Sequence, residues 1–110
     1  MRPRKYYDWT IPRSVVTVVR AVCADYERRR IAIEKKVVDD RVREEYVRIN
    51  NVIDAALDDV EIGIRFTLLE DVVSGKGYEG TIASPFLAKN SYYNRKRKLV
   101  HDIAVGLNLI

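Results

Sequence analysis

The sequence is poor in the residues that make covalent cross-links and most metal sites. Cys23 is the only cysteine and His101 the only histidine among 110 residues. One cysteine excludes a disulfide framework and any multi-cysteine metal site, and it fits a reducing cytoplasm. No run approaches the roughly 20 apolar residues of a membrane-spanning helix, and the first residues, MRPRKYYDW, do not resemble a signal peptide. We therefore expect a cytoplasmic protein that has no membrane segment.

Groups that enzymes use are equally scarce. No Ser or Cys has a recognisable base partner, and SGKGYEG lacks the spacing and the Lys-Ser/Thr ending of a phosphate-binding loop. The acid pairs Asp39-Asp40 and Asp58-Asp59 fall at expected helix ends, where capping and the helix dipole explain them at least as well as metal binding. We expect a protein that is not an enzyme and that carries neither a cofactor nor a metal.

Length and apolar periodicity predict one helical domain over residues 1–110. An apolar content of 47% in a chain of this length is enough for a single core. Apolar residues recur every three or four positions without strict alternation, so the pattern favours helices in spite of frequent Val and Ile. We predict an all-α fold, in which a basic and aromatic arm (1–11) precedes a long antiparallel helical hairpin (12–60) and a helix-turn-helix-like bundle (61–110).

Three amphipathic stripes define the expected helices before position 80. The first helix covers 12–36, the second begins at a cap on Asp39 or Asp40, and the third ends at the Gly75 and Gly77 pair. The residues expected to face the core are Val16, Val19, Cys23, Tyr26, Ile33 and Val37, then Val42, Tyr46, Ile49, Ile53, Ala56 and Val60, then Ile62, Phe66, Leu69 and Val73. The cysteine of the first stripe is expected to be a small core residue.

Charge is distributed unevenly along the chain. Between Asp54 and Asp71 there are six acids and one base, Arg65, whereas five bases and no acid lie between Lys89 and Lys98. A domain with an acidic flank and a basic end has a directional field, which is typical of a protein that docks an anion at one end. The alternative is that these charge runs are only solvated faces.

The basic segment lies in an expected last helix, capped by Asn90 or Ser91. Its core side is expected to carry Tyr92, Lys96, Leu99, Val100, Ile103, Ala104 and Leu107. At 100° per residue the opposite side carries Ser91, Asn94, Lys98 and His101, flanked by Arg95 and Arg97.

Those outward side chains suit a DNA major groove. Arg and Lys suit guanine edges and phosphates, Asn suits adenine, and Ser suits either. Asn94 and Arg95 fall in the first turns, the part of a recognition helix that points at base edges. The candidate DNA-binding residues are Ser91, Asn94, Arg95, Arg97 and Lys98.

Three segments follow one another in the order VVRAVCADYERRRIAIE, RINNVIDAAL and TIASPFLAKNSYYNRKRKLVHDIA. In this order the chain resembles the phage-encoded transcriptional regulators of the RinA and ArpU type, and the resemblance covers nearly the whole chain. It implies a C-terminal helix-turn-helix similar to the last region of sigma factors, a role in controlling late phage genes, and double-stranded DNA as the partner.

The resemblance also implies roles for single residues. Ile82, Ala83 and Leu87 would pack in the first motif helix, and Asn90 would be the cap of the second. Tyr92 or Tyr93 would anchor the recognition helix, with the candidate residues above facing DNA. Pro85 would cost about 3 kcal/mol inside a helix, so we expect Ser84 to cap a displaced short helix with Pro85 in its first turn.

Several alternatives stay open. One of Tyr92 and Tyr93 is expected to be a core aromatic and the other a phosphate contact, and RKRK is either functional or a solubilising face. The arm with Tyr6, Tyr7 and Trp9 either enters a minor groove or docks on the bundle. A lone helix-turn-helix reads few base pairs, which favours a homodimer or a contact with RNA polymerase. The competing function is a non-catalytic helical adaptor in phage packaging or beside a polymerase.

Overall fold

The computed structural model describes residues 11–80 and 87–110, and all regular structure in these ranges is helical. The elements are α1 (Arg13–Ala24), α2 (Tyr26–Lys35), α3 (Asp40–Leu57), η2 (Ile62–Ile64), α4 (Arg65–Ser74), η3 (Tyr78–Gly80) and α5 (Lys89–Gly106), where η marks a short 3-10 helix. The all-α prediction is confirmed for this part of the chain. None of the helices within these ranges is both long enough and apolar enough to cross a bilayer.

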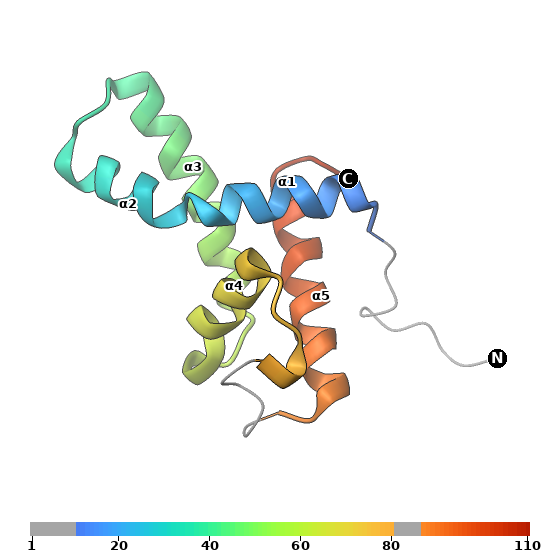
Figure 1. Ribbon diagram of the computed structural model, residues 1–110. Helices are drawn as coiled ribbons and strands as arrows, with labels where there is room; N and C mark the ends of the chain where they lie inside the picture. Colours follow the sequence, from blue (N-terminus) through green and yellow to red (C-terminus); the bar gives the residue numbers. More distant parts are fainter. Residues whose placement is uncertain (1–10, 81–86) are drawn as a thin grey trace.

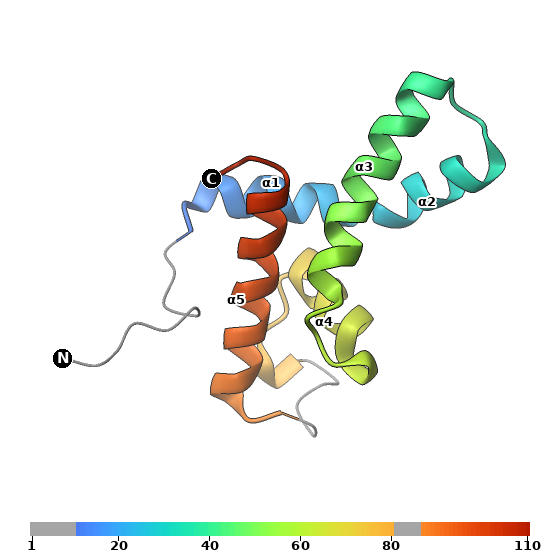
Figure 2. The ribbon, with the colours of Figure 1, turned by 180° about the vertical axis from the view of Figure 1, so that it is seen from behind.

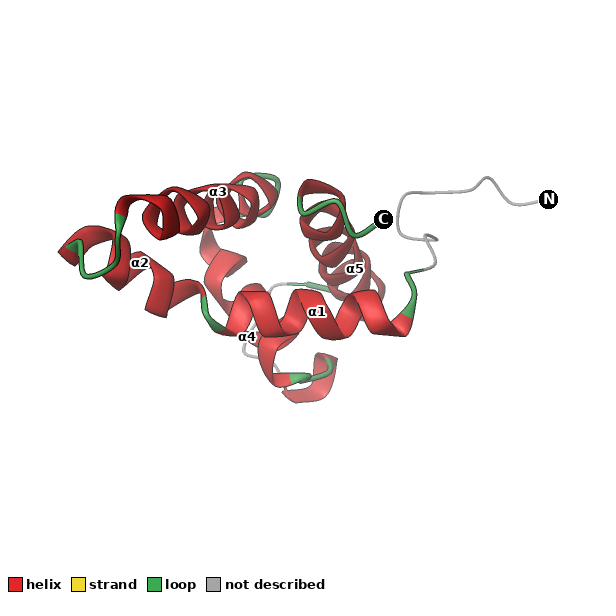
Figure 3. Ribbon diagram, turned by 90° about the horizontal axis from the view of Figure 1, so that it is seen from above, coloured by secondary structure: helices red, strands yellow, loops and turns green. Residues whose placement is uncertain are grey.

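The helices form a body with one projecting pair. Helix α1 lies across α4 and α5, while α2 and the first half of α3 extend away from them (Figures 1 and 2). Seen from above, α3 and α5 lie on the same side of α1 (Figure 3). The start of α5 lies at the end of the molecule remote from α2 (Figure 1). This arrangement leaves the first turns of α5 at one extremity of the protein.

The core lies where α1, α3, α4 and α5 meet. Its largest fully buried side chains, all with less than 2% of their surface exposed, are Val19, Ile53, Leu68, Tyr92, Leu99 and Ile103. Cys23 is also buried, as predicted, and burial raises the pKa of its thiol to about 11. Its place among the apolar side chains of the core makes Cys23 a packing residue.

The predicted continuous helix over 12–36 is wrong, because the chain breaks at Asp25 into α1 and α2. The cause is a buried polar contact with α3. Arg29 Nε donates to Asn50 Oδ1 at 2.7 Å and its Nη2 donates to the carbonyl of Val22, while Asn50 Nδ2 donates to the carbonyl of Tyr26. Side chains that take helix carbonyls as acceptors interrupt the regular hydrogen-bond ladder and bend the helix. The long two-helix hairpin is therefore replaced by a shorter pair, α2 and α3.

Two helix boundaries agree with the sequence prediction. Asp39 caps α3, since its Oδ1 accepts a 2.9 Å hydrogen bond from the backbone N–H of Val42. Helix α4 ends at Gly75, whose φ of 77° is the left-handed conformation that glycine adopts without a steric penalty. Both signals are local, which is why the sequence carries them.

The third predicted stripe is only partly correct. Ile62 and Phe66 were expected in the core, yet they are 81% and 65% exposed. Positions 62–64 form a 3-10 turn with about three residues per turn. The side chains before and after it therefore point in other directions than they would in a continuous α-helix. The buried side chains here are Ile64, Leu68, Leu69, Asp71 and Val72. Val37, expected at the end of the first stripe, is likewise exposed.

Helices α3 and α5 approach closely near the C-terminal end of α5. A Cβ atom at Gly106 would lie only 2.5 Å from Cγ1 of Val52. A contact this short forces the neighbouring side chain or the helix to move, so the crossing requires glycine at this position.

Part of the predicted helix-turn-helix lies outside the described residues. This applies to Ile82, Ala83, Ser84 and Pro85, and also to the aromatic arm before Ile11. Leu87 is described, and it stands in the connector before α5 and in no helix. The prediction that it belongs to a first motif helix is therefore wrong.

Candidate nucleic-acid interface

One face of α5 is anchored in the core as the sequence predicts. The buried side chains are Tyr92, Leu99, Val100, Ile103 and Ala104. Lys96 is half-buried on this side, where its ammonium donates to the carbonyl of Lys76, and desolvation lowers its pKa. The direction in which the opposite face points is thus fixed by packing.

Hydrogen bonds tie the first turns of α5 to the segment before it. The Tyr92 hydroxyl donates to Asp71 of α4 at 2.9 Å. The Tyr93 hydroxyl accepts a 3.0 Å hydrogen bond from the backbone N–H of Tyr78, and the Tyr78 hydroxyl donates to the carbonyl of Leu87. Both tyrosines of the predicted pair therefore have structural contacts, including the one expected to bind phosphate.

Helix α5 begins two to three residues earlier than predicted. Its first residue is Lys89, and the N-cap is Ala88 in place of Asn90 or Ser91. Ala88 has no side-chain oxygen to offer to the first-turn N–H groups. Asn90 instead lies inside the first turn, where its side chain is exposed. The earlier start adds Asn90 to the polar residues at this end of the helix.

Three polar side chains on these first turns have no hydrogen-bond partner in the part of the chain that the structure describes. Asn90 is exposed, and Ser91 and Asn94 are half-buried. Within 11–80 and 87–110 the structure contains no hydrogen bond from the side chain of any of the three. Amide and hydroxyl groups of this kind can bind acceptors and donors on another molecule without first breaking an internal contact.

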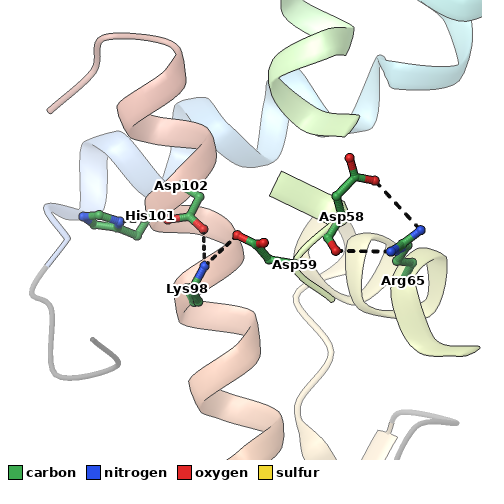
Figure 4. A network of polar contacts seen from close by, with 6 residues as sticks. All are labelled: Asp58, Asp59, Arg65, Lys98, His101 and Asp102. Carbon is green, nitrogen blue, oxygen red and sulfur yellow. Dashed lines mark hydrogen bonds and ion pairs between the residues drawn. The ribbon is translucent and has the colours of Figure 1, made fainter. Parts of the chain in front are cut away.

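The cations on one flank of α5 are paired with acids that follow α3. The Arg95 guanidinium contacts Glu61, with Nε 2.8 Å from Oε2 and Nη2 2.6 Å from Oε1. Lys98 Nζ lies 3.1 Å from Asp59 and 2.6 Å from Asp102 (Figure 4). The hydrogen bond from Arg95 lowers the pKa of Glu61, and that with Asp102 raises the pKa of Lys98. The predicted acidic flank and basic end are therefore neighbours that neutralise each other in part.

Two further basic residues of this region, Arg97 and Lys89, have surroundings that differ from those of Arg95 and Lys98. Arg97 is exposed and borders a groove with Ile11 and Val16 beside α1. Lys89 at the helix start is 3.4 Å from Glu79, and both of these side chains are largely exposed. The five predicted site residues hence share one helix but have different surroundings: Ser91 and Asn94 lie at its start, Arg95 and Lys98 lie beside acids on one flank, and Arg97 lies on the other flank.

Sequence reasoning placed Asn90 at the helix cap and not among the candidate DNA-binding residues, and it gave Asp59 and Glu61 no role at this site. Counting the helix from Lys89 would have placed Asn90 about 40° from Asn94 on the outer face, at 100° per residue. The acids gave no such signal, because Glu61 and Arg95 are 34 positions apart. Only the packing of α3 against α5 brings them together.

Comparisons with protein-family models, curated proteins and solved structures found no match. Among the described residues, no three His, Cys, Asp or Glu side chains gather as metal ligands would. The case for a function therefore rests on the geometry of α5 and on the sequence resemblance to phage regulators.

Proposed function

We propose that this protein is a double-stranded DNA-binding transcriptional regulator that reads DNA with the first turns of α5. The observation that carries the proposal is a set of three polar side chains on a helix whose other face is buried; Asn90, Ser91 and Asn94 have no side-chain hydrogen bond within residues 11–80 and 87–110. Base edges in the major groove offer the hydrogen-bond partners that these side chains lack.

The cations of α5 have the complementary role. Arg95 and Lys98 lie to one side of Asn94 and Arg97 to the other, at 100° per residue. Cations that flank a reading face meet the phosphates on the two walls of a groove. The first-turn N–H groups, for which Ala88 provides no side-chain acceptor, add a further attraction for phosphate.

The resemblance to the RinA and ArpU type gives the proposed biological setting. It supports a regulator of late phage genes that needs no catalytic group. One helix contacts only a few base pairs, so we further propose that a second copy of the chain or an RNA polymerase contributes to specificity.

A salt titration tests the DNA contact. We expect Arg97→Ala and Lys98→Ala each to weaken binding to a fluorescent duplex and to reduce the magnitude of the log K against log [salt] slope by about 1. Arg30→Ala is the matched control, because Arg30 is a cation on the remote helix α2, paired with Glu27 and Glu34. An unchanged slope for both α5 variants would identify RKRK as a solvated surface.

A second candidate function, a non-catalytic helical adaptor, has its own supporting observation. Ile62 at the start of η2 and Phe66 in the first turn of α4, four positions apart, are both largely exposed. Adjacent exposed apolar side chains are common where a protein partner binds. If no duplex sequence is enriched by the protein, while Phe66→Ser abolishes capture of a purified partner, the adaptor is the correct function.

A further inference from the structure

The contact between Arg95 and Glu61 uses a full edge of the guanidinium. Arg95 Nε lies 2.9 Å from Oε1 and 2.8 Å from Oε2, and Nη2 lies 2.6 Å from Oε1. Arginine binds carboxylates and phosphates with this bidentate geometry, in which two parallel N–H groups donate to two oxygen atoms. Glu61 therefore occupies the donor edge that a phosphate would use.

A second cation of α5, Lys98, is also held by carboxylates about one helical turn after Arg95. Lys98 is three positions after Arg95, and residues so spaced are neighbours on one helix face. Its ammonium is held between Asp102 of the same helix and Asp59 of the α3–α4 connector (Figure 4). Both cations on this flank of α5 are thus contacted by acids of one short segment, Asp59 and Glu61.

We propose that Asp59 and Glu61 form an acidic latch, which holds Arg95 and Lys98 as an internal substitute for phosphate and which the DNA backbone must displace. This inference rests on the proposed DNA-binding function and adds a regulatory contact to it. The latch lowers affinity for every duplex, because each binding event must first break these ion pairs. It leaves the polar side chains at the start of α5 unaffected.

The solvent exposure of the latch carboxylates is consistent with their displacement by DNA phosphates. The side chains of Glu61 and Asp59 are 54% and 64% exposed, whereas those of Arg95 and Lys98 are 31% and 30% exposed. Ion pairs with solvent-exposed partners are weak and are screened by salt. A duplex presents a dense row of phosphates, so it can displace isolated carboxylates at a modest loss of affinity.

Asp58 provides a matched control for the charge change. It stands next to Asp59 in sequence, but its carboxylate faces Arg65, 3.9 Å away, and contacts neither cation of α5 (Figure 4). Asp58→Asn therefore removes the same charge from nearly the same place without opening the latch. Any general electrostatic gain from removing an acid will appear in this variant too.

The test compares Glu61→Gln, Asp59→Asn, their double variant and Asp58→Asn in binding to a labelled random duplex. We expect a gain in affinity of about 3-fold for each single latch variant and about 10-fold for the double variant, as weak ion pairs predict. Asp58→Asn should gain less than about 2-fold. Equal gains in the control and in the latch variants, or no gain in the double variant, would overturn the latch.

A second measurement needs no DNA. Sulfate is titrated into ¹⁵N-labelled protein while the Arg95 Nε–H signal is followed, and the double latch variant should saturate at lower sulfate than the wild-type protein. Identical titration curves would refute the latch even if DNA binds. Conversely, if the double latch variant saturates at lower sulfate than the wild-type protein while neither protein binds duplex DNA, that result would support the latch and overturn the proposed function.

Discussion

The hydroxyl of Tyr92 donates a 2.9 Å hydrogen bond to the carboxylate of Asp71, and both side chains are buried. Tyr92 lies on the first turn of α5 and Asp71 near the end of α4. The same hydroxyl lies 3.3 Å from the carbonyl of Lys76 in the turn that follows α4. This one side chain thus fixes where α5 begins relative to the rest of the protein.

Removing that hydroxyl should destabilise the fold. We expect Tyr92→Phe to lower the free energy of unfolding by about 1–3 kcal/mol, because it leaves a buried carboxylate oxygen without its donor. Urea denaturation followed by circular dichroism measures the loss. Tyr93→Phe is the control: its hydroxyl is only half-buried, so water can replace it as an acceptor and the loss should be smaller. An unchanged free energy of unfolding in Tyr92→Phe would contradict this account of the α4–α5 contact.

The crossing of α3 and α5 predicts a steric coupling between Gly106 and Val52. Gly106→Ala places a methyl group 2.5 Å from Val52 Cγ1 and should cost about 1–3 kcal/mol, as overpacking does. In the Val52→Ala background the same substitution should cost much less, since the atom it meets is gone. Thermal denaturation of the four proteins gives the coupling, and additive losses would show that the helices do not cross as described.

The Arg95–Glu61 contact predicts a pH dependence. The hydrogen bond from Arg95 lowers the pKa of Glu61 below the ordinary value of about 4.3. A depressed carboxyl pKa stabilises the fold above the unfolded-state pKa, and this contribution disappears as pH falls through the folded-state pKa. A ¹³C carboxyl titration should show the Glu61 pKa rising in Arg95→Gln. The pKa of Glu45, lowered by Arg48, should not change in that variant.

The sequence carries the local features of this fold and little of its tertiary detail. The cap at Asp39 and the stop at Gly75 depend on neighbouring backbone atoms, so both are visible in the sequence. The break at Asp25 depends on Arg29 reaching Asn50, 21 positions away, and no Gly or Pro marks it. The exposure of Ile62 follows from a 3-10 turn that periodicity does not reveal.

The same division applies to the candidate interface. Winding α5 at a fixed angle per residue separates its buried face from its polar face correctly, because packing follows that periodicity. It gives no information on the surroundings of Arg95 and Lys98, since Glu61 and Asp59 come from 34 and 39 positions earlier in the chain. Charge counting predicted a directional field, whereas the fold brings the opposite charges into contact.

The most direct test of the central claim measures Asn94 on two DNAs. A duplex enriched by the protein from a random pool is compared with a scrambled duplex of the same composition, using wild-type protein and Asn94→Ala. Asn51→Ala, which changes an exposed Asn on α3, is the control. If α5 reads sequence, Asn94→Ala should lose about 1–3 kcal/mol on the enriched duplex and much less on the scrambled one. Equal losses on both DNAs, or the absence of any enriched sequence, would contradict it.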